Sequence, residues 1–298
     1  MTKLRNREEK LDYAKVFENM VTAVSNYLEE CHLESMILGI SGGIDSTINA
    51  AIGCEVFKRT GKKLIGLSLM TSTNMSDEDY AASLVGAEFC TEYYKYNMED
   101  EYKTLADMCA HINGEGDNIS RGNIKARMRM MILFDASARY KGIVFSGANK
   151  TEVLLGFSTL GGDSIGAIAP LSELFKHEVY EFAHWLKENV YTDSIALEKS
   201  IALTPTDGNG VMAGGDLAQI APGFTYNDVD DMLYVYLDAT NKASAVAELK
   251  TKYPADTVDM VIRRHNNSRF KRHHIPLIVD PIFGSILQNN GERLSETI

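Results

Sequence analysis

The sequence has no long apolar run, and its first ten residues are charged rather than hydrophobic. A membrane-spanning helix needs about 20 mostly apolar residues in succession and a secretory signal needs an apolar core, so we predict neither. Only four cysteines are present, at positions 31, 54, 90 and 109, and their spacing indicates neither a disulfide framework nor a zinc site. We therefore expect a soluble protein of a reducing cytoplasm, without a membrane partner.

An excess of basic residues is also lacking. The 30 Lys and Arg residues are outnumbered by 41 Asp and Glu, which gives a formal net charge of −11. A protein that coats nucleic acid needs basic side chains facing the phosphates, so we expect no nucleic-acid partner. Residues 263–274 form a local basic cluster, which indicates either a solvated charged segment or a site for one anion.

Short apolar segments alternate with helical patterns between residues 36 and 146. We predict strands over residues 36–40, 64–70, 92–96 and 142–146, and helices over residues 77–89, 102–111 and 120–140. This alternation predicts an α/β fold with a Rossmann-like, doubly wound parallel sheet and helices on both faces. Because such sheets bind ligands at the carboxyl ends of their strands, we expect the functional site just after Ile40, Met70 and Ser146.

We predict a single domain over residues 1–298, since this length fits one large α/β domain. Apolar residues at helical spacing predict an amphipathic N-terminal helix over residues 7–30. Further helices are predicted over residues 174–186, 227–237 and 244–250. Five glycines lie between residues 204 and 223 with little apolar periodicity, and we interpret this stretch as a lid over the site.

The strongest local signal is the segment Ser41–Ser46, which reads SGGIDS and lies between a predicted strand and a predicted helix. Gly42 and Gly43 permit close backbone approach, and amides at the start of the following helix attract an anion. Asp45 would repel a phosphate unless a divalent cation lay between them, so this carboxylate indicates Mg²⁺. A Gly-Gly turn before a helix is otherwise a tight connection, with Asp45 as a favourable charge in the first turn. The Walker A lysine is absent from this loop.

The SGGIDS loop resembles that of the ATP-pyrophosphatase superfamily, of adenine nucleotide alpha hydrolase-like fold. Its members cleave ATP between the α- and β-phosphates and adenylate an acyl or carbonyl oxygen. Over roughly residues 36–280, further segments are similar in order to ammonia-dependent NAD synthetase. These segments are GNIKARMRM (122–130), GANKTE (147–152), LGF (155–157), GD (162–163), PT (205–206), GFTY (223–226), DD (230–231) and KR (271–272).

The resemblance implies an activity, a set of partners and an assembly. It implies that deamido-NAD is amidated by ammonia at the expense of ATP, through an adenylated carboxylate, to give NAD, AMP and pyrophosphate. It also implies a homodimer. About thirty-five residues precede the first predicted strand, which is too few for an added glutaminase domain, so we expect free ammonia as the nitrogen donor.

The resemblance also implies the residues of the ATP and metal sites. The ATP-binding positions are Gly39, Ile40, Ser41, Gly42, Gly43, Ile44, Asp45, Ser46, Lys176 and Thr206. Glu152 matches the family's metal-binding glutamate, and we expect it to share Mg²⁺ with Asp45; a surface glutamate on a short helix is the alternative. Lys176 matches the ATP-binding lysine, which would stabilise charge on the departing pyrophosphate, although a lysine that begins a helix is often solvated.

On the acceptor side, Asn123, Arg127 and Phe134 lie near one face of the predicted helix, at offsets of 4 and 11 residues. An amide, a guanidinium and an aromatic ring suit the nicotinate, ribose and phosphate of a dinucleotide; the alternative is a solvated arginine and a core phenylalanine. The resemblance adds Lys271 as a substrate-binding residue that contacts pyrophosphate. It also places Asp163 near the ammonia, where a carboxylate could accept a proton. The alternative is an aspartate that only stabilises a turn, which would have the same local sequence.

Some positions depart from the family pattern. Leu160 stands where a lysine for deamido-NAD is usual, Ala167 replaces an aspartate and Phe270 replaces a histidine. Residues 68–74 lack the arginine and glutamine usually placed beside ATP. These changes spare the metal residues, so the acceptor is either bound differently or differs from deamido-NAD.

Three other readings follow from the loop. The chain could be a ligase of the same superfamily that adenylates a different carboxylate, or a non-catalytic nucleotide-binding homologue. A tRNA-thiolating enzyme would need a basic surface and catalytic cysteines, and neither pattern is present.

Overall fold

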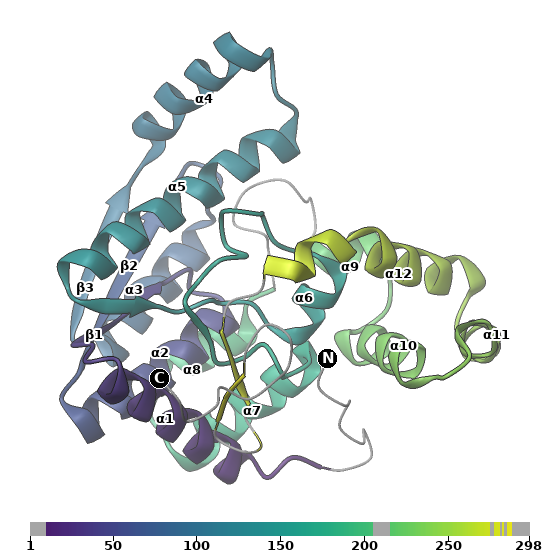
Figure 1. Ribbon diagram of the computed structural model, residues 1–298, viewed down its shortest axis with the longest axis horizontal. Coiled ribbons are helices and arrows are strands. Elements are labelled where there is room, and N and C mark those ends of the chain that lie inside the picture. Colours follow the sequence, from purple (N-terminus) through teal and green to yellow (C-terminus); the bar gives the residue numbers. More distant parts are fainter. Residues whose placement is uncertain (1–9, 205–214, 275–276, 281, 283–284, 288–298) are drawn as a thin grey trace.

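The computed structural model describes residues 10–204, 215–274, 277–280, 282 and 285–287. Within these ranges, a four-stranded parallel sheet has the strand order β3-β2-β1-β4 (Figure 1). Its strands are β1 (Ser35–Gly39), β2 (Lys63–Met70), β3 (Glu92–Asn97) and β4 (Gly142–Val144). Ile37 at the centre of β1 pairs with Ile65 on one side and with Val144 on the other. The predicted parallel sheet is confirmed.

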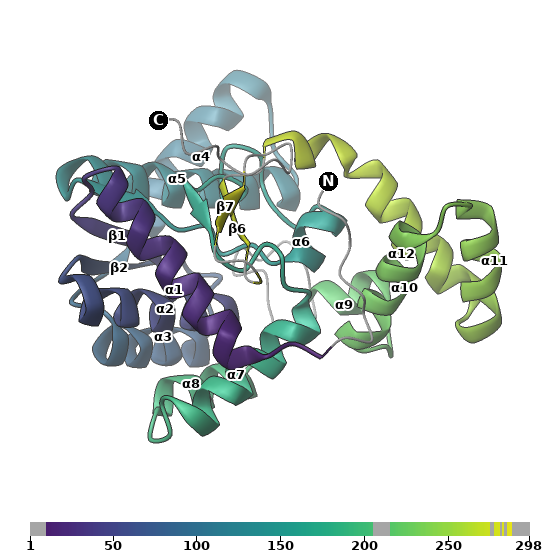
Figure 2. The ribbon, with the colours of Figure 1, turned by 60° about the horizontal axis from the view of Figure 1, so that its bottom comes forward.

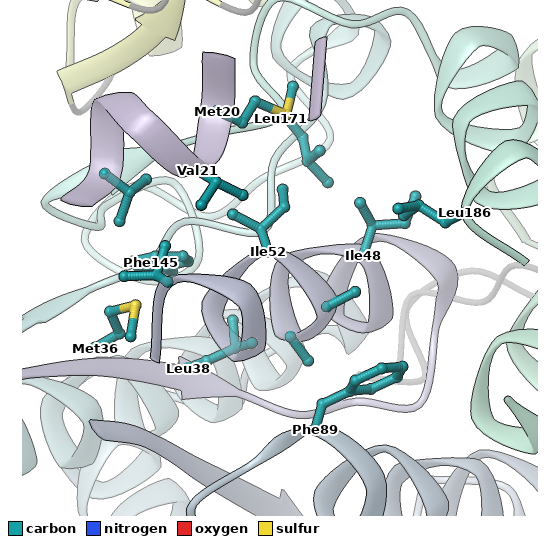
Figure 3. Close-up of a cluster of buried hydrophobic side chains, with 14 of the residues drawn as sticks. Met20, Val21, Met36, Leu38, Ile48, Ile52, Phe89, Phe145, Leu171 and Leu186 are labelled. Atoms are coloured by element: carbon teal, nitrogen blue, oxygen red, sulfur yellow. The ribbon is translucent and has the colours of Figure 1, made fainter. Parts of the chain in front are cut away.

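Helices cover both faces of this sheet because the side chains of β1 alternate between them. Met36 and Leu38 belong to a large core with α1 (Tyr13–Glu30), α2 (Ile44–Thr60) and α3 (Ser76–Phe89). Figure 3 shows Ile48 and Ile52 of α2 packed within this core. Ile37 points the opposite way, against α5 (Asn118–Arg139), and α4 (Glu99–Asn113) packs beside α5. The doubly wound arrangement is thus confirmed.

A second, smaller sheet contains β5 (Ile168–Ala169), β6 (Leu277–Asp280) and β7 (Ser285–Leu287). β5 pairs with β6 in parallel, and β6 pairs with β7 in antiparallel fashion. A bridge between Phe145 and Ile168 joins this sheet to the end of β4. β6 and β7 also lie against α1, so these two strands return to the N-terminal helix.

The remaining helices all follow β4 along the chain. They are α6 (Lys150–Leu155), α7 (Lys176–Asn189), α8 (Ile195–Ala202), α9 (Gly215–Ile220), α10 (Tyr226–Asp238), α11 (Lys242–Lys252), α12 (Ala255–Asn267) and the 3-10 helix η1 (Arg269–His274). Figure 2 shows α10, α11 and α12 grouped away from the parallel sheet. They surround a second apolar core that includes Leu155 of α6, Met232 of α10 and Val261 of α12.

Two boundary predictions need correction. The N-terminal helix begins at Tyr13 rather than residue 7 within the described chain, because Asp12 accepts a hydrogen bond from the Lys15 N–H at 3.2 Å and caps the helix. The glycine-rich stretch is not one loop, since residues 215–220 form α9. Residues 205–214, including Thr206, lie outside the described residues.

None of the helices in the described ranges combines the length and the apolar character needed to cross a membrane.

Candidate active site

A cavity of about 530 Å³ opens at the carboxyl ends of β1 and β2. Ile40, Met70 and Gly147 line it, so it coincides with the strand ends where a site was expected. Many of the predicted site residues share this lining: Gly39, Ile40, Ser41, Gly43, Ile44, Asp45, Ser46, Asn123, Glu152, Asp163, Lys176 and Lys271. Residues from both halves of the chain therefore meet around one space.

The SGGIDS loop is fixed by packing and by hydrogen bonds. Gly42 has φ of +84°, and a Cβ there would lie 2.4 Å from the Glu78 carbonyl oxygen, so only glycine fits against α3. The Ser41 hydroxyl accepts a hydrogen bond from the Gly43 N–H at 3.2 Å, and the Ser46 hydroxyl donates to the Gly43 carbonyl at 2.9 Å. The first turn of α2 lines the cavity, and the amides at the N-terminus of a helix form a favourable site for phosphates.

Lys176, the first residue of α7, lies between two carboxylates. Its Nζ contacts Asp45 Oδ2 from α2 and lies 3.0 Å from Glu152 Oε1 of α6. Asn149 Nδ2 donates a second hydrogen bond to Asp45, to Oδ1 at 2.9 Å. Burial alone would lower the pKa of Lys176, but the charges of Asp45 and Glu152 outweigh it and raise this pKa well above 10.5. Lys176 is therefore an ammonium held by two carboxylates from separate elements.

The donor set around Lys176 fits Mg²⁺. Asp45 and Glu152 each direct a carboxylate oxygen to Lys176 Nζ, and Mg²⁺ is usually held by one or two carboxylates together with substrate phosphates and water. Among the described residues, no group of three His, Cys, Asp or Glu side chains lies close enough to bind a metal ion. A cation at Asp45 and Glu152 would accordingly need ligands from a nucleotide.

Asp163 faces the cavity and has cations nearby. Its Oδ1 accepts a hydrogen bond from the Thr159 N–H at 2.7 Å. The carboxylate is open to the cavity, but the protein surrounds that cavity, so desolvation raises the pKa of Asp163 above its ordinary value. The positive charges of Lys271 and Arg129 act in the opposite direction. A carboxylate with a raised pKa is suited to accept and return a proton.

Lys271 closes the cavity from the C-terminal side. Its Nζ donates hydrogen bonds to the Gly156 carbonyl at 2.8 Å and to the Ser158 carbonyl at 2.5 Å. Burial and the nearby charge of Arg264 lower the pKa of Lys271. Lys271 therefore orders the chain segment that leads from Glu152 to Asp163.

The three residues predicted to share one face of α5 lie in two different environments. Asn123 lines the cavity and accepts a hydrogen bond from the Thr159 hydroxyl at 2.7 Å. Arg127 and Phe134 are exposed and do not belong to the cavity lining, although Arg127 Nε donates to the Leu160 carbonyl at 3.1 Å. The other residues of α5 that line the cavity are Ile119, Ala126, Arg129, Met130 and Leu133. The helix is thus turned away from the predicted face.

Two cations of α5, Arg129 and Lys125, lie near the end of β2 and were not predicted as site residues. Arg129 lines the cavity, and its guanidinium donates to the Leu69 carbonyl at 2.8 Å and to Asn74 Oδ1 at 3.2 Å. Lys125, one turn earlier, donates to the Thr73 hydroxyl at 3.0 Å. Both belong to the GNIKARMRM segment, and their i, i+4 spacing was the available signal. Arg129 thus supplies a guanidinium at the end of β2, where residues 68–74 contain no arginine.

None of the three departing side chains lines the cavity in the described part of the chain. Leu160 contributes its carbonyl to Arg127, while Ala167 packs against the large core. Phe270 is exposed. The departures therefore alter the surroundings of the cavity rather than its walls.

Known proteins resemble this chain over most of its length. The NAD synthase family model matches residues 16–275. The chain is 33% identical to the NH(3)-dependent NAD(+) synthetase of Chlorobium phaeobacteroides, covering 80% of each chain. It is 31% identical to the enzyme of the same name from Thermococcus sibiricus, covering 88% of this chain and 96% of that one.

Solved structures show the same fold. The NMN synthetase of Francisella tularensis superimposes with a TM-score of 0.71 at 24% identity, covering 88% of this chain and 97% of that one. The NH3-dependent NAD synthetase of Campylobacter jejuni has a TM-score of 0.66 at 24% identity, covering 88% and 96%. Since the family model spans most of the sequence and relatives above 30% identity cover it broadly, this chain belongs to the NAD synthase family.

Proposed function

We propose that this protein catalyses the ATP-dependent amidation of deamido-NAD by ammonia, with NAD, AMP and pyrophosphate as products. The observation that carries the proposal is the buried Lys176 ammonium between Asp45 and Glu152, beside the SGGIDS loop. Membership of the NAD synthase family and the names of the relatives support the choice of acceptor. An ATP site that offers amides and a lysine suits release of pyrophosphate.

In the first step, a carboxylate oxygen of the acceptor attacks the α-phosphorus of ATP. The bond from that phosphorus to the bridging oxygen breaks, and pyrophosphate leaves with the bonding electrons. The amides of the loop and the ammonium of Lys176 stabilise the negative charge that develops, so no side-chain nucleophile is required. Mg²⁺ bound by Asp45 and Glu152 would supply further electrostatic stabilisation of the phosphate oxygens.

In the second step, ammonia attacks the carbonyl carbon of the mixed anhydride and AMP leaves. The attacking nitrogen must lose a proton, and the carboxylate of Asp163 accepts it in this proposal. The raised pKa of Asp163 brings the proton affinity of its carboxylate nearer to that of the attacking amine. Asn123 and Lys271 hold the segment that presents Asp163, through Thr159 and Ser158.

We also infer a homodimer that works in the cytoplasm. Large apolar side chains on α4 and α5 are exposed, and exposed apolar patches mark interaction surfaces; the side chains are Met108, Ile112, Met131 and Phe134. In such a homodimer, the partner subunit would cover Phe134 and Arg127. These two side chains would then contact a bound acceptor molecule. The four cysteines are free thiols, which suits a reducing compartment.

The proposal is tested by incubating the protein with Mg-ATP, ammonium and deamido-NAD. NAD, AMP and pyrophosphate should appear in equal amounts, and formation of ADP would defeat the mechanism. A parallel reaction with nicotinate mononucleotide tests the acceptor: pyrophosphate release there, but none with deamido-NAD, would select a different carboxylate. ATP binding without AMP from either acceptor would instead identify a non-catalytic homologue.

A further inference from the structure

Asp230 of α10 is buried at the back of the carboxylate–lysine cluster. It is only 1% exposed, and it is absent from the residues that line the cavity. Its Oδ1 accepts a hydrogen bond from the Thr151 hydroxyl at 2.5 Å, and its Oδ2 accepts one from the His177 N–H at 3.0 Å. The His177 ring nitrogen Nδ1 also lies 2.8 Å from Oδ2. These contacts compensate a buried carboxylate that would otherwise be costly.

The partners of Asp230 are the chain neighbours of the two residues that meet at the candidate metal site. Thr151 precedes Glu152 in α6, and His177 follows Lys176 in α7. The Thr151 hydroxyl also accepts a hydrogen bond from the Lys176 N–H at 2.8 Å. One carboxylate therefore fixes the first turn of α6 relative to the first turn of α7.

We propose that Asp230 is a positioning residue for catalysis: through Thr151 and His177 it sets the separation of the Glu152 carboxylate and the Lys176 ammonium. This role rests on the proposed function, because it assigns catalytic work to that pair. It also links α10 to the nucleotide site by hydrogen bonds, in addition to the contact of Tyr226, whose ring centroid lies 5.7 Å from Lys176 Nζ. Groups that orient residues at a metal or nucleotide site typically affect activity by about 10- to 100-fold.

A purely structural role is the competing explanation, and the neighbouring residue provides the matched control. Asp231 also anchors α10, because its Oδ2 accepts hydrogen bonds from Lys252 Nζ at 2.8 Å and from the Tyr253 hydroxyl at 2.9 Å. Those partners lie away from the cavity lining. Asp231→Asn and Asp230→Asn make the same chemical change on the same helix, but only the second disturbs α6 and α7.

The experiment compares Asp230→Asn, Thr151→Val, Thr151→Ser and Asp231→Asn in the full chain. An asparagine at position 230 has one acceptor oxygen, so it cannot satisfy the Thr151 hydroxyl and the His177 N–H together. Thr151→Val keeps the shape but removes the hydroxyl, and Thr151→Ser restores it. The readouts are kcat, the KM values for ATP and deamido-NAD, the melting temperature, and crystal structures of the variants.

We expect Asp230→Asn and Thr151→Val to lower kcat about 10- to 100-fold while KM for deamido-NAD is unchanged. Thr151→Ser should recover most of kcat, and Asp231→Asn should lower the melting temperature without lowering kcat. In the crystal structures, the Lys176 Nζ to Glu152 Oε1 distance should lengthen from 3.0 Å in the first two variants only.

Wild-type kcat in Asp230→Asn, or an equal loss of kcat in Asp231→Asn, would overturn the positioning role. Should the wild-type chain form no AMP at all, the proposed function fails, and the variant crystal structures decide the positioning role alone. An unchanged Lys176–Glu152 distance in both Asp230→Asn and Thr151→Val would then refute it.

Discussion

Lys176 and Asp45 are 131 positions apart in the sequence, yet the Lys176 ammonium contacts the Asp45 carboxylate inside the cavity. The contact joins the first turn of α7 to the first turn of α2. Glu152 completes the cluster from α6. The Lys176 ammonium therefore holds together the carboxylates of Asp45 and Glu152. The same two carboxylates would bind a cation that accompanies the nucleotide.

Substitution of Asp45 should remove most of the activity. Asp45→Asn deletes a charge that pairs with Lys176 and that would hold Mg²⁺ beside the phosphates, so AMP formation should fall about 100-fold. The initial rate of AMP release with saturating substrates measures this effect. Asp100→Asn is the control, because that side chain is 97% exposed on α4 and should leave the rate unchanged. A wild-type rate in Asp45→Asn would contradict the assignment.

Lys176→Met should destabilise the fold, because it leaves two carboxylates facing each other without a cation. The free energy of unfolding should fall by about 3 kcal/mol, the usual cost of removing one partner of a buried ion pair. Lys95→Met is the matched control: its ion pair with Asp79 is exposed and should be worth less than about 1 kcal/mol. Urea denaturation at neutral pH compares the two variants.

The pH dependence of this difference follows from the raised pKa of Lys176. A group whose pKa is higher in the folded state stabilises the protein fully below its unfolded value, near 10.5, and loses this contribution as the pH rises through the folded value. The stability gap between wild type and Lys176→Met should therefore be constant between about pH 7 and 9 and shrink above about 10.5. A gap that closes already below about pH 9 would show that Lys176 is not held as an ammonium.

Asp163→Asn should separate the two chemical steps. An amide keeps the acceptor for the Thr159 N–H but cannot take a proton from the attacking amine. NAD formation should fall at least about 100-fold, the usual contribution of a general base. Exchange of labelled pyrophosphate into ATP in the presence of deamido-NAD should continue, since adenylation does not use Asp163. Loss of the exchange reaction to the same extent would place Asp163 in the first step instead.

Arg129→Ala should weaken ATP binding rather than acceptor binding. The guanidinium lies at the end of β2 with Leu69 and Asn74, and loss of a charged hydrogen-bonding group there should raise KM for ATP about 10-fold. Arg129→Lys should recover little, because an ammonium cannot reproduce the two-pronged geometry of arginine. Arg139→Ala, on the same helix but exposed and bonded to Asp135, is the control. A rise confined to the KM for deamido-NAD would assign Arg129 to the acceptor.

The parallel sheet could be predicted because its signals are local. The apolar segment that contains Ile37 is buried on both faces, and glycine and charged residues bound it. Asp45 was predicted at the edge of the sheet because the SGGIDS loop directly follows the first predicted strand. Glu152 was predicted there because it follows the strand predicted over residues 142–146. Both expectations agree with the shared contact to Lys176.

The missed features depend on contacts that no local pattern contains. β5 has only two residues and exists because residues 277 and 278, more than one hundred positions later, pair with it. The face of α5 that enters the cavity is set by how Met130 and Leu133 pack under the sheet, which turned Phe134 outward. Asp230 belongs to a segment that resembles the family, but its role could not be predicted because its partners Thr151 and His177 lie far away in the sequence.

Gly42 has a mechanical consequence for the nucleotide site. With no side chain between the loop and α3, the peptide at Gly42 lies directly against the backbone of Glu78 and Ala82. Ala82 belongs to the large core, so a displacement of the loop would have to move that core as well. A triphosphate thus meets a surface that is rigid before it arrives, and little conformational entropy is lost when it binds. Adjustment to the shape of the acceptor then falls to the opposite wall, where the side chain of Lys271 donates a hydrogen bond to the backbone carbonyl of Ser158.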